Sequence, residues 1–247
     1  MSFKQLFAYS QPIVAAATVL AVAVFASAIV AGYTAYAIKV SGDMIEVTGS
    51  AKQSVTADFG RWTILLETKT GLSDQQSGYD RLEKAKDSIT AYLKEQGYTD
   101  VETPVASINA NYIYPDRSEP ILTGYTVSRV VVVRSENVEG ISDLANNIAP
   151  LTGNQYTVTS QGLELTYQKL TETRVALLTE AIADAQARAD AIAKETGRGV
   201  DMLRSASGGV VQVLPQGSVE ISDYGTYDTQ NINKEVMVTV RATFSLR

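Results

Sequence analysis

The sequence predicts an α+β fold in which antiparallel or mixed sheets pack with about three helices, preceded by one transmembrane helix. Two observations support this fold class. A stretch of 34 residues without a charged side chain separates Lys4 from Lys39 near the start of the chain. After it, segments with the two-residue period of strands alternate with helical segments, and several strand pairs are spaced like hairpins. This mixture differs from the regular alternation of a doubly wound nucleotide-binding fold.

The uncharged stretch predicts a transmembrane anchor at residues 13–38, after a cytoplasmic leader at residues 1–12. Its centre, Ile13 to Gly32, is interrupted by only two polar residues, Thr18 and Ser27. Twenty helical residues rise about 30 Å, which matches the hydrocarbon core of a bilayer. A core helix of a soluble protein rarely stays apolar on every face for this length.

The competing interpretation of this segment is a secretory signal peptide. Ala35-Tyr36-Ala37 has the small-x-small pattern of a cleavage site, so cleavage after Ala37 stays open. We favour a retained anchor, because the apolar region is longer than the roughly 7–15 residues of a signal core. Both interpretations carry residues 43–247 out of the cytosol. We expect a single-pass protein of the inner (cytoplasmic) membrane, with its N-terminus inside and its C-terminal domain in the periplasm.

Small residues recur at four-residue spacing along the predicted anchor. Ala23, Ser27 and Ala31 share one face, and Ala28 and Gly32 lie beside it. Such spacing lets helix backbones approach closely in lipid. Alanine as plain filler explains the pattern equally well, so self-association through the anchor is one of two interpretations.

Charge and composition exclude several function classes for the exported part. The whole chain has 21 basic and 27 acidic residues, and only Lys4 precedes position 38, so 20 basic residues remain and the net charge is −7. This charge argues against nucleic acid and against docking onto anionic lipid. The chain has no cysteine and no histidine, which removes Ser-His-Asp and Cys-His systems and zinc sites built on those residues. Carboxylate chemistry, Ser-Lys chemistry and oxygen-only metal binding remain open.

The exported part begins with a strand pattern followed by a helical one. Alternation over Met44–Lys69 predicts two antiparallel strands separated by a turn or bulge at Gly49-Ser50. Ser73 and Gln76 have the spacing of a capping box, and Gly97 is placed to end the helix that follows. The predicted apolar face of this helix consists of Tyr79, Leu82, the stem of Lys86, Ile89 and Leu93.

The remaining elements follow the same reasoning. A long helix at Gln168–Thr196, ended by Gly197, carries an apolar stripe and, on its opposite side, an Asp184–Arg188 pair. The predicted stripe is Leu178, Ile182, Ala185, Ala189 and Ile192, with the alanines suited to a close approach to a sheet. Strands are predicted at Val101–Tyr114, Tyr125–Arg134, Tyr156–Tyr167, Met202–Leu214 and Ile232–Leu246, with a turn at Pro115–Pro120 and a short helix at Val138–Ala149 ended by Pro150.

No catalytic, cofactor-binding or metal-binding residue stands out, and we expect none. Ser207-Gly208-Gly209 lacks the spacing of a phosphate loop. The loop Asp223–Asp228 has the Tyr and Asp residues to stack a sugar or hold calcium, but its acids lack EF-hand spacing and a plain linker is favoured. The cluster Asn111–Asp116 suits a protein interface and ordinary turn packing equally well.

Several phrases, in this order, resemble the SIMPL-domain family (DUF541), which includes periplasmic immunogenic proteins. They are Ile45-Glu-Val-Thr-Gly49, Asn111-Tyr-Ile-Tyr-Pro115, Gly124-Tyr-Thr-Val127 with its valine-rich continuation, and the alanine-rich helix Glu180–Gly197. The resemblance covers roughly residues 43–247. It implies an envelope protein linked to oxidative and envelope stress, with ring-like oligomers in some members and no established catalytic residue to carry over.

The sequence therefore predicts a non-enzymatic, membrane-anchored periplasmic protein that self-assembles into a ring-like homo-oligomer, as an envelope scaffold or chamber. The predicted partners are the membrane, through the N-terminal helix, and further copies of the chain, with no nucleic acid and no cofactor. A carboxylate-dependent envelope hydrolase is the alternative and needs two acids converging in a cleft. A channel subunit is a third hypothesis and needs an open lumen.

Overall fold

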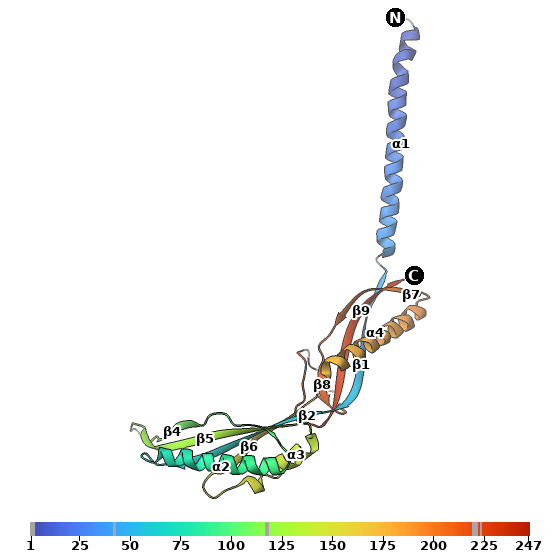
Figure 1. The fold of residues 1–247 in the computed structure, drawn as a ribbon. Helices are drawn as coiled ribbons and strands as arrows, with labels where there is room; N and C mark the ends of the chain where they lie inside the picture. Colours follow the sequence, from blue (N-terminus) through green and yellow to red (C-terminus); the bar gives the residue numbers. More distant parts are fainter. Residues whose placement is uncertain (1–2, 42, 117–118, 219–221, 223) are drawn as a thin grey trace. The chain divides into compact units, whose positions relative to one another are not determined.

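A computed structural model describes residues 3–41, 43–116, 119–218, 222 and 224–247 (Figure 1). The predicted α+β class is confirmed: three helices and a 3₁₀ turn accompany two antiparallel sheets, after one long N-terminal helix. The elements are α1 (Phe3–Ser41), β1 (Met44–Thr56), β2 (Phe59–Thr70), α2 (Gln75–Glu95), β3 (Asp100–Glu102), β4 (Ser107–Ile113), β5 (Ile121–Ser135), α3 (Val138–Asn146), the 3₁₀ turn η1 (Ala149–Leu151), β6 (Thr157–Thr166), α4 (Leu170–Glu195), β7 (Val200–Gly208), β8 (Gln212–Pro215) and β9 (Asn233–Leu246).

The chain divides into two compact units. One contains residues 1–49, 182–208 and 240–247, and the other contains residues 50–181 and 209–239. Strands β1 and β9 and helix α4 therefore each contribute residues to both units.

The five-stranded sheet has the order β3-β5-β2-β6, with β4 pairing β5 beside β3. β2 lies at the centre and pairs antiparallel with β5 along its length, from Gly60↔Ser135 to Thr70↔Tyr125. β2 also pairs with β6, but only as far as Glu67↔Thr157. β2 therefore continues beyond the start of β6.

One face of this sheet carries the main core. Helix α2 packs on β2 and β5, and α3 packs on β2 and β6. β2 alternates strictly, so that Trp62, Ile64 and Leu66 are fully buried towards the helices. Burial of such large side chains contributes roughly 1.5–3 kcal/mol each. The buried part of this core also contains Leu82, Ala85, Ile89, Leu93, Tyr98, Val127, Val131, Val133, Ile141 and Leu151.

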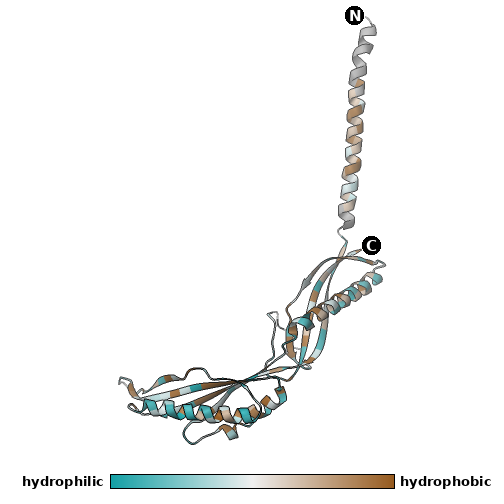
Figure 2. Cartoon of the chain, in the orientation of Figure 1, coloured by the Kyte–Doolittle hydropathy of each residue, from teal (hydrophilic) through white to brown (hydrophobic). Residues whose placement is uncertain are grey.

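The four-stranded sheet has the order β1-β9-β7, with β8 also pairing β9. In β9 the even-numbered positions from Lys234 to Phe244 are all buried. Within the second unit, Leu177 of α4 packs against Val213 of β8 and Val236 of β9. Figure 2 shows apolar residues alternating with polar ones along these strands, as expected for a sheet with one covered face.

Helix α4 buries a narrower and smaller face than the sequence predicts. Its buried apolar residues follow strict four-residue steps: Leu177, Ala181, Ala185, Ala189 and Ala193. Leu178 is half-buried and packs against the core of the second unit, and Ile182 is half-buried, but Ile192 is exposed, so the predicted stripe was wrong at Ile192. The alanines are the buried residues because their small side chains allow α4 a close approach that larger residues on the same face would prevent. The Asp184–Arg188 ion pair (2.9 Å) and the end of the helix before Gly197 (φ +69°) are confirmed.

The predicted break between the first two strands was wrong. Gly49-Ser50 lies inside β1, and the chain leaves the strand only at Ala57 and Asp58. Strands β1 and β2 then join different sheets instead of pairing with each other. Long-range backbone hydrogen bonds fix this crossing, from Ala57 N–H to Ile232 O (2.8 Å) and from Asp58 N–H to Thr166 O (3.0 Å). Pairing partners this distant in sequence leave no local signal.

Two helix boundaries also differ from the predictions. The capping box was wrong: α2 begins at Gln75 after Asp74, which makes no side-chain cap, and the Gln76 amide donates to Asp80 instead (3.0 Å). Helix α3 ends at Asn146, three residues earlier than predicted, and Pro150 lies within η1. The end of α2 at Gly97 (φ +91°) is confirmed.

Two predicted strands are each divided in the structure. Residues 101–114 form β3 and β4, separated by a segment containing Pro104, which lacks the N–H that a sheet ladder requires. Residues 202–214 form β7 and β8, separated at Gly209. A Cβ at Gly209 would lie 2.2 Å from Thr239 Oγ1. The backbone N–H of Gly209 donates to Thr239 O (2.8 Å). Only glycine permits this close approach to β9.

Candidate functional site

Helix α1 has a surface suited to lipid. A 22-residue stretch, Ala16–Ala37, has a mean hydropathy of 2.1 and none of it is buried. Among the described residues this is the one helix long and apolar enough to cross a membrane. Figure 2 shows apolar and neutral residues around its central part, with no polar stripe. The predicted anchor at residues 13–38 therefore coincides with a helix of the right length and composition.

Three hydroxyl groups of α1 donate to backbone carbonyl oxygens of the same helix. Thr18 donates to Val14 O (3.0 Å), Ser27 to Val24 O (2.8 Å) and Thr34 to Val30 O (2.8 Å). An unsatisfied hydroxyl in hydrocarbon costs several kcal/mol, and these bonds to the helix backbone remove that cost. The helix can therefore face lipid on all sides with these residues in place.

Two tyrosines mark the end of the apolar stretch nearer the domain. Tyr33 and Tyr36 are both exposed, and the helix continues to Ser41. Tyrosine is enriched where a spanning helix leaves the hydrocarbon, because its ring is apolar and its hydroxyl is polar. The small residues Ala23, Ser27 and Ala31 are exposed along the helix, and a Cβ at Gly32 would meet no atom within 4 Å. This face is free to receive a second helix.

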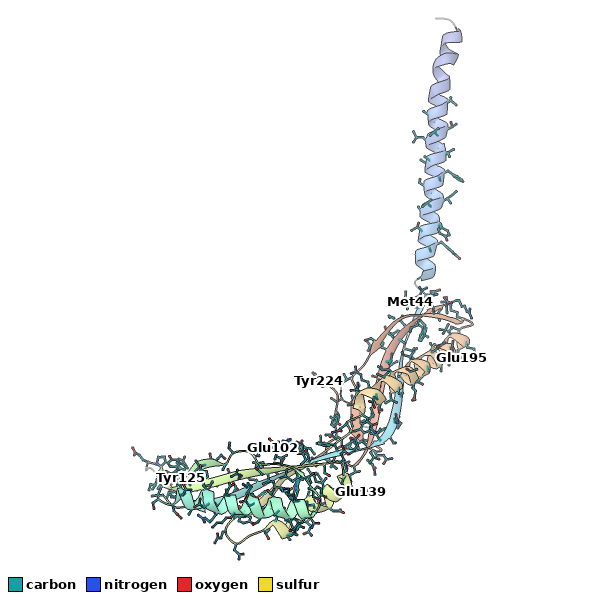
Figure 3. The ribbon with its side chains drawn as sticks, viewed as in Figure 1. Met44, Glu102, Tyr125, Glu139, Glu195 and Tyr224 are labelled. Atoms are coloured by element: carbon teal, nitrogen blue, oxygen red, sulfur yellow. The ribbon has the colours of Figure 1, made fainter. Side chains whose placement is uncertain are left out.

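The loop between β8 and β9 has a buried ion pair at its end. Asp223 of the predicted loop lies outside the described residues. Tyr224 is exposed on the outside of the loop (Figure 3). Asp228 is instead buried, and its carboxylate lies 3.2 Å from the ammonium of Lys234, whose side chain is fully buried. Lys234 also donates to Asp228 O (2.6 Å).

The carboxylate of Asp228 is fully occupied by protein donors. Its Oδ1 accepts from the backbone N–H groups of Gln230 (2.9 Å) and Asn231 (3.3 Å) and from the Asn231 amide (3.2 Å). Burial by itself raises the pKa of this carboxyl, but the hydrogen bonds from Gln230, Lys234 and Asn231 outweigh burial and hold the pKa below its ordinary value. The arrangement is that of a structural turn, in which both carboxylate oxygens of Asp228 accept from protein donors.

The lowered pKa of Asp228 predicts a loss of stability in acid. Above the ordinary pKa of aspartate, about 4, the carboxylate is ionised in both folded and unfolded states and its contribution is complete. As the pH falls through the lower pKa of the folded state, the contribution disappears. We expect Asp228→Asn to flatten the fall of unfolding free energy below about pH 4, measured by urea denaturation at a series of pH values. Glu180→Gln, at an exposed position of α4, is the control, and an unchanged acid slope in Asp228→Asn would contradict this account.

The β4–β5 hairpin carries exposed apolar side chains near its tip. We define the hairpin patch as Tyr112, Ile113, Tyr114 and Ile121, all of which are exposed, Tyr114 by 75%. Ile113 and Ile121 are direct cross-strand partners. Turn packing, one of the two interpretations of Asn111–Asp116, would have covered Tyr114. Clustered, exposed Tyr and Ile instead suit a protein contact.

A cavity of about 510 Å³ lies at the end of β2 in the second unit. Its lining contains one carboxylate, Glu67, and one ammonium, Lys69. The hydrolase hypothesis needs two carboxylates at a fixed separation, and this cavity does not provide them. Within the described ranges, no three acidic side chains gather in an arrangement that would hold a metal ion.

The comparisons with known proteins identify the domain. Residues 45–244 match the SIMPL family, described as a protein of unknown function, DUF541. The chain belongs to the SIMPL family. This SIMPL protein is similar to the 26 kDa periplasmic immunogenic protein of Brucella melitensis biotype 1, with 26% identity over 166 residues. The aligned region is 64% of this chain and 65% of that relative, so it spans less than two thirds of the relative's length.

The buried Lys234 is the residue that sequence reasoning missed. It lies within the predicted strand Ile232–Leu246, where no role was assigned to it. It lies in phase with Val236, Val238 and Val240, which the two-residue period places on the buried face. A lysine in phase with three buried valines needs a partner, and Asp228 in the preceding loop provides it. The two-residue period of the strand therefore already indicated that Lys234 is buried.

Proposed function

We propose that this SIMPL protein is a membrane-anchored protein of the periplasm that self-associates into a ring and serves as an envelope scaffold. The observation that carries the proposal is the apolar stretch Ala16–Ala37, whose surface is entirely unburied. The name of the Brucella relative describes a periplasmic protein, which agrees with export of the domain. The N-terminus then lies on the cytoplasmic side of the inner membrane, and residues 43–247 lie on its periplasmic side. The link to oxidative or envelope stress stays a prediction from the family resemblance.

Two different strand edges support the ring. β1 lies at one edge of the four-stranded sheet and β7 at the other. An edge strand presents unpaired backbone groups that a neighbouring chain can pair with. A contact between two different surfaces is head-to-tail, and head-to-tail contacts close into rings when the rotation fits. The exposed side chains of Met202 and Leu203 on β7 add apolar area to such a contact.

The proposal is tested by the mass of the full-length protein in detergent or a nanodisc. Mass photometry should give an oligomer at micromolar concentration. Leu203→Lys, at the β7 edge, should reduce the oligomer, because a charge there opposes close pairing. Val175→Lys is the matched control, since Val175 is an exposed apolar residue on α4. A monomeric wild-type protein would refute self-association but leave the anchor untouched.

A further inference from the structure

The cavity at the end of β2 has a wall that hydrogen bonds hold in place. It arises because β6 pairs with β2 only to Glu67↔Thr157, while β2 continues to Thr70 alongside β5. The segment Gly153–Tyr156 takes the place of further strand pairing and forms the wall. Thr68 donates to Gln155 O (2.9 Å), and Thr157 donates to Glu67 O (3.3 Å).

Tyr156 fixes the other side of this wall. Its hydroxyl donates to Leu151 O (3.2 Å), and its ring packs against the main core. A Cβ at Gly153 would lie 2.4 Å from that ring, so the loop follows the tyrosine closely. A wall bound to both the strand and the core keeps its shape when no ligand is present, which lowers the entropic cost of binding.

Opposite charges line the cavity without partners of their own. Glu67 and Lys69 are two positions apart on β2, so their side chains leave the same face of the sheet. Among the described residues, neither side chain forms a hydrogen bond or an ion pair. On the same strand, Arg61 pairs with Glu164 at 3.2 Å. Glu67 is half-buried, so its charge is only partly compensated by water.

The spacing of these two residues along β2 has a matching ligand. Their Cα atoms lie about 7 Å apart, because they are two positions apart on the strand. An extended dipeptide also spans about 7 Å from its ammonium to its carboxylate. We propose that the cavity binds a short zwitterionic peptide of dipeptide length, with its ammonium on Glu67 and its carboxylate on Lys69. Both contacts are charge-assisted, and Thr126, Gln155 and Thr157 also line the cavity.

The size of the cavity and the charges of its two ionisable residues agree with this ligand class. A volume of about 510 Å³ falls in the range of small-molecule sites. The two lining charges cancel, so a ligand with a single charge would leave one of them unpaired. A zwitterion satisfies both.

The test uses the full-length protein in nanodiscs and L-alanyl-L-alanine as the probe, with binding measured by isothermal titration calorimetry. We expect saturable binding, weakened about tenfold or more by Glu67→Gln and by Lys69→Met, because each change removes one charge-assisted contact. N-acetylation of the dipeptide should weaken binding to the wild type but not further to Glu67→Gln. C-terminal amidation of the dipeptide should weaken binding to the wild type but should not weaken binding to Lys69→Met further.

Controls separate the site from general surface charge. Arg61→Met breaks an exposed ion pair elsewhere on β2 and should leave dipeptide binding unchanged. Circular dichroism melts of Glu67→Gln and Lys69→Met should match the wild type, because Lys69 is exposed and, among the described residues, the Glu67 side chain forms no hydrogen bond or ion pair that the substitution would break. No binding at millimolar dipeptide would overturn the proposal. Equal binding of the acetylated, amidated and free dipeptides would overturn it too, as would binding of N-acetylglucosamine unaffected by either substitution.

Discussion

Replacing Trp62 with alanine should lower the free energy of unfolding by about 3–5 kcal/mol. Trp62 is fully buried in the core between the five-stranded sheet and its helices. Its removal loses the transfer free energy of a large aromatic ring and leaves a cavity that the surrounding strands fill only partly. The indole N–H also donates to Ser160 Oγ (2.9 Å), so the substitution leaves that hydroxyl without its donor.

The measurement is urea denaturation of the full-length protein in detergent, followed by circular dichroism. Trp62 is the single tryptophan of the chain, so its fluorescence reports on this core in the wild type but is absent from the variant. Arg61→Ala, one position along β2, is the control. Its ion pair with Glu164 is exposed on both sides, and such pairs contribute about 1 kcal/mol or less. Equal losses of stability in the two variants would contradict the core as described.

Replacing Lys234 with methionine should cost a similar amount, about 3–5 kcal/mol. Methionine fills most of the volume of the lysine stem, so the cost comes chiefly from the groups that lose their partner. The carboxylate and the backbone carbonyl of Asp228 would both lose a buried donor. A buried charge left without compensation is among the costliest single changes in a protein.

A double-mutant cycle separates this ion pair from simple packing. Asp228→Asn and Lys234→Met should together cost less than the sum of the two single variants, because either change alone already breaks the contact. Arg188→Met is the control, since its ion pair with Asp184 has a similar length (2.9 Å) but is partly exposed. Strict additivity of Asp228→Asn and Lys234→Met would show that the two residues do not interact.

The sequence predicts well the elements that local periodicity determines. The helix ending at Gly97, the valine-rich strand β5 and the apolar helix α1 all follow from patterns within about 20 residues. Long-range pairing explains the failures: Ala57 and Asp58, where β1 ends, bond to Ile232 and Thr166, more than a hundred residues away. The face of α4 was predicted from the four- and three-residue spacing of its apolar side chains. The structure buries its alanines because the contact needs a close approach.

The candidate site was less predictable than the fold. The anchor and the exposed hairpin tip follow from composition. The cavity does not, because its Glu67 and Lys69 look like ordinary surface charges on an alternating strand. A cavity forms beside Glu67 and Lys69 only because β6 begins at Thr157 and Tyr156 precedes it. That relation joins residues about 90 positions apart, beyond the reach of any local pattern.

The measurement that tests the account most directly is the intact mass of the protein recovered from the membrane fraction after an alkaline carbonate wash. A retained α1 predicts a chain of 26.6 kDa that stays in the pellet. External protease should then digest residues 43–247 in spheroplasts, where the inner membrane is sealed and the periplasm open. A soluble periplasmic chain that begins at Ile38 would contradict the account, because it would show α1 to be a cleaved signal.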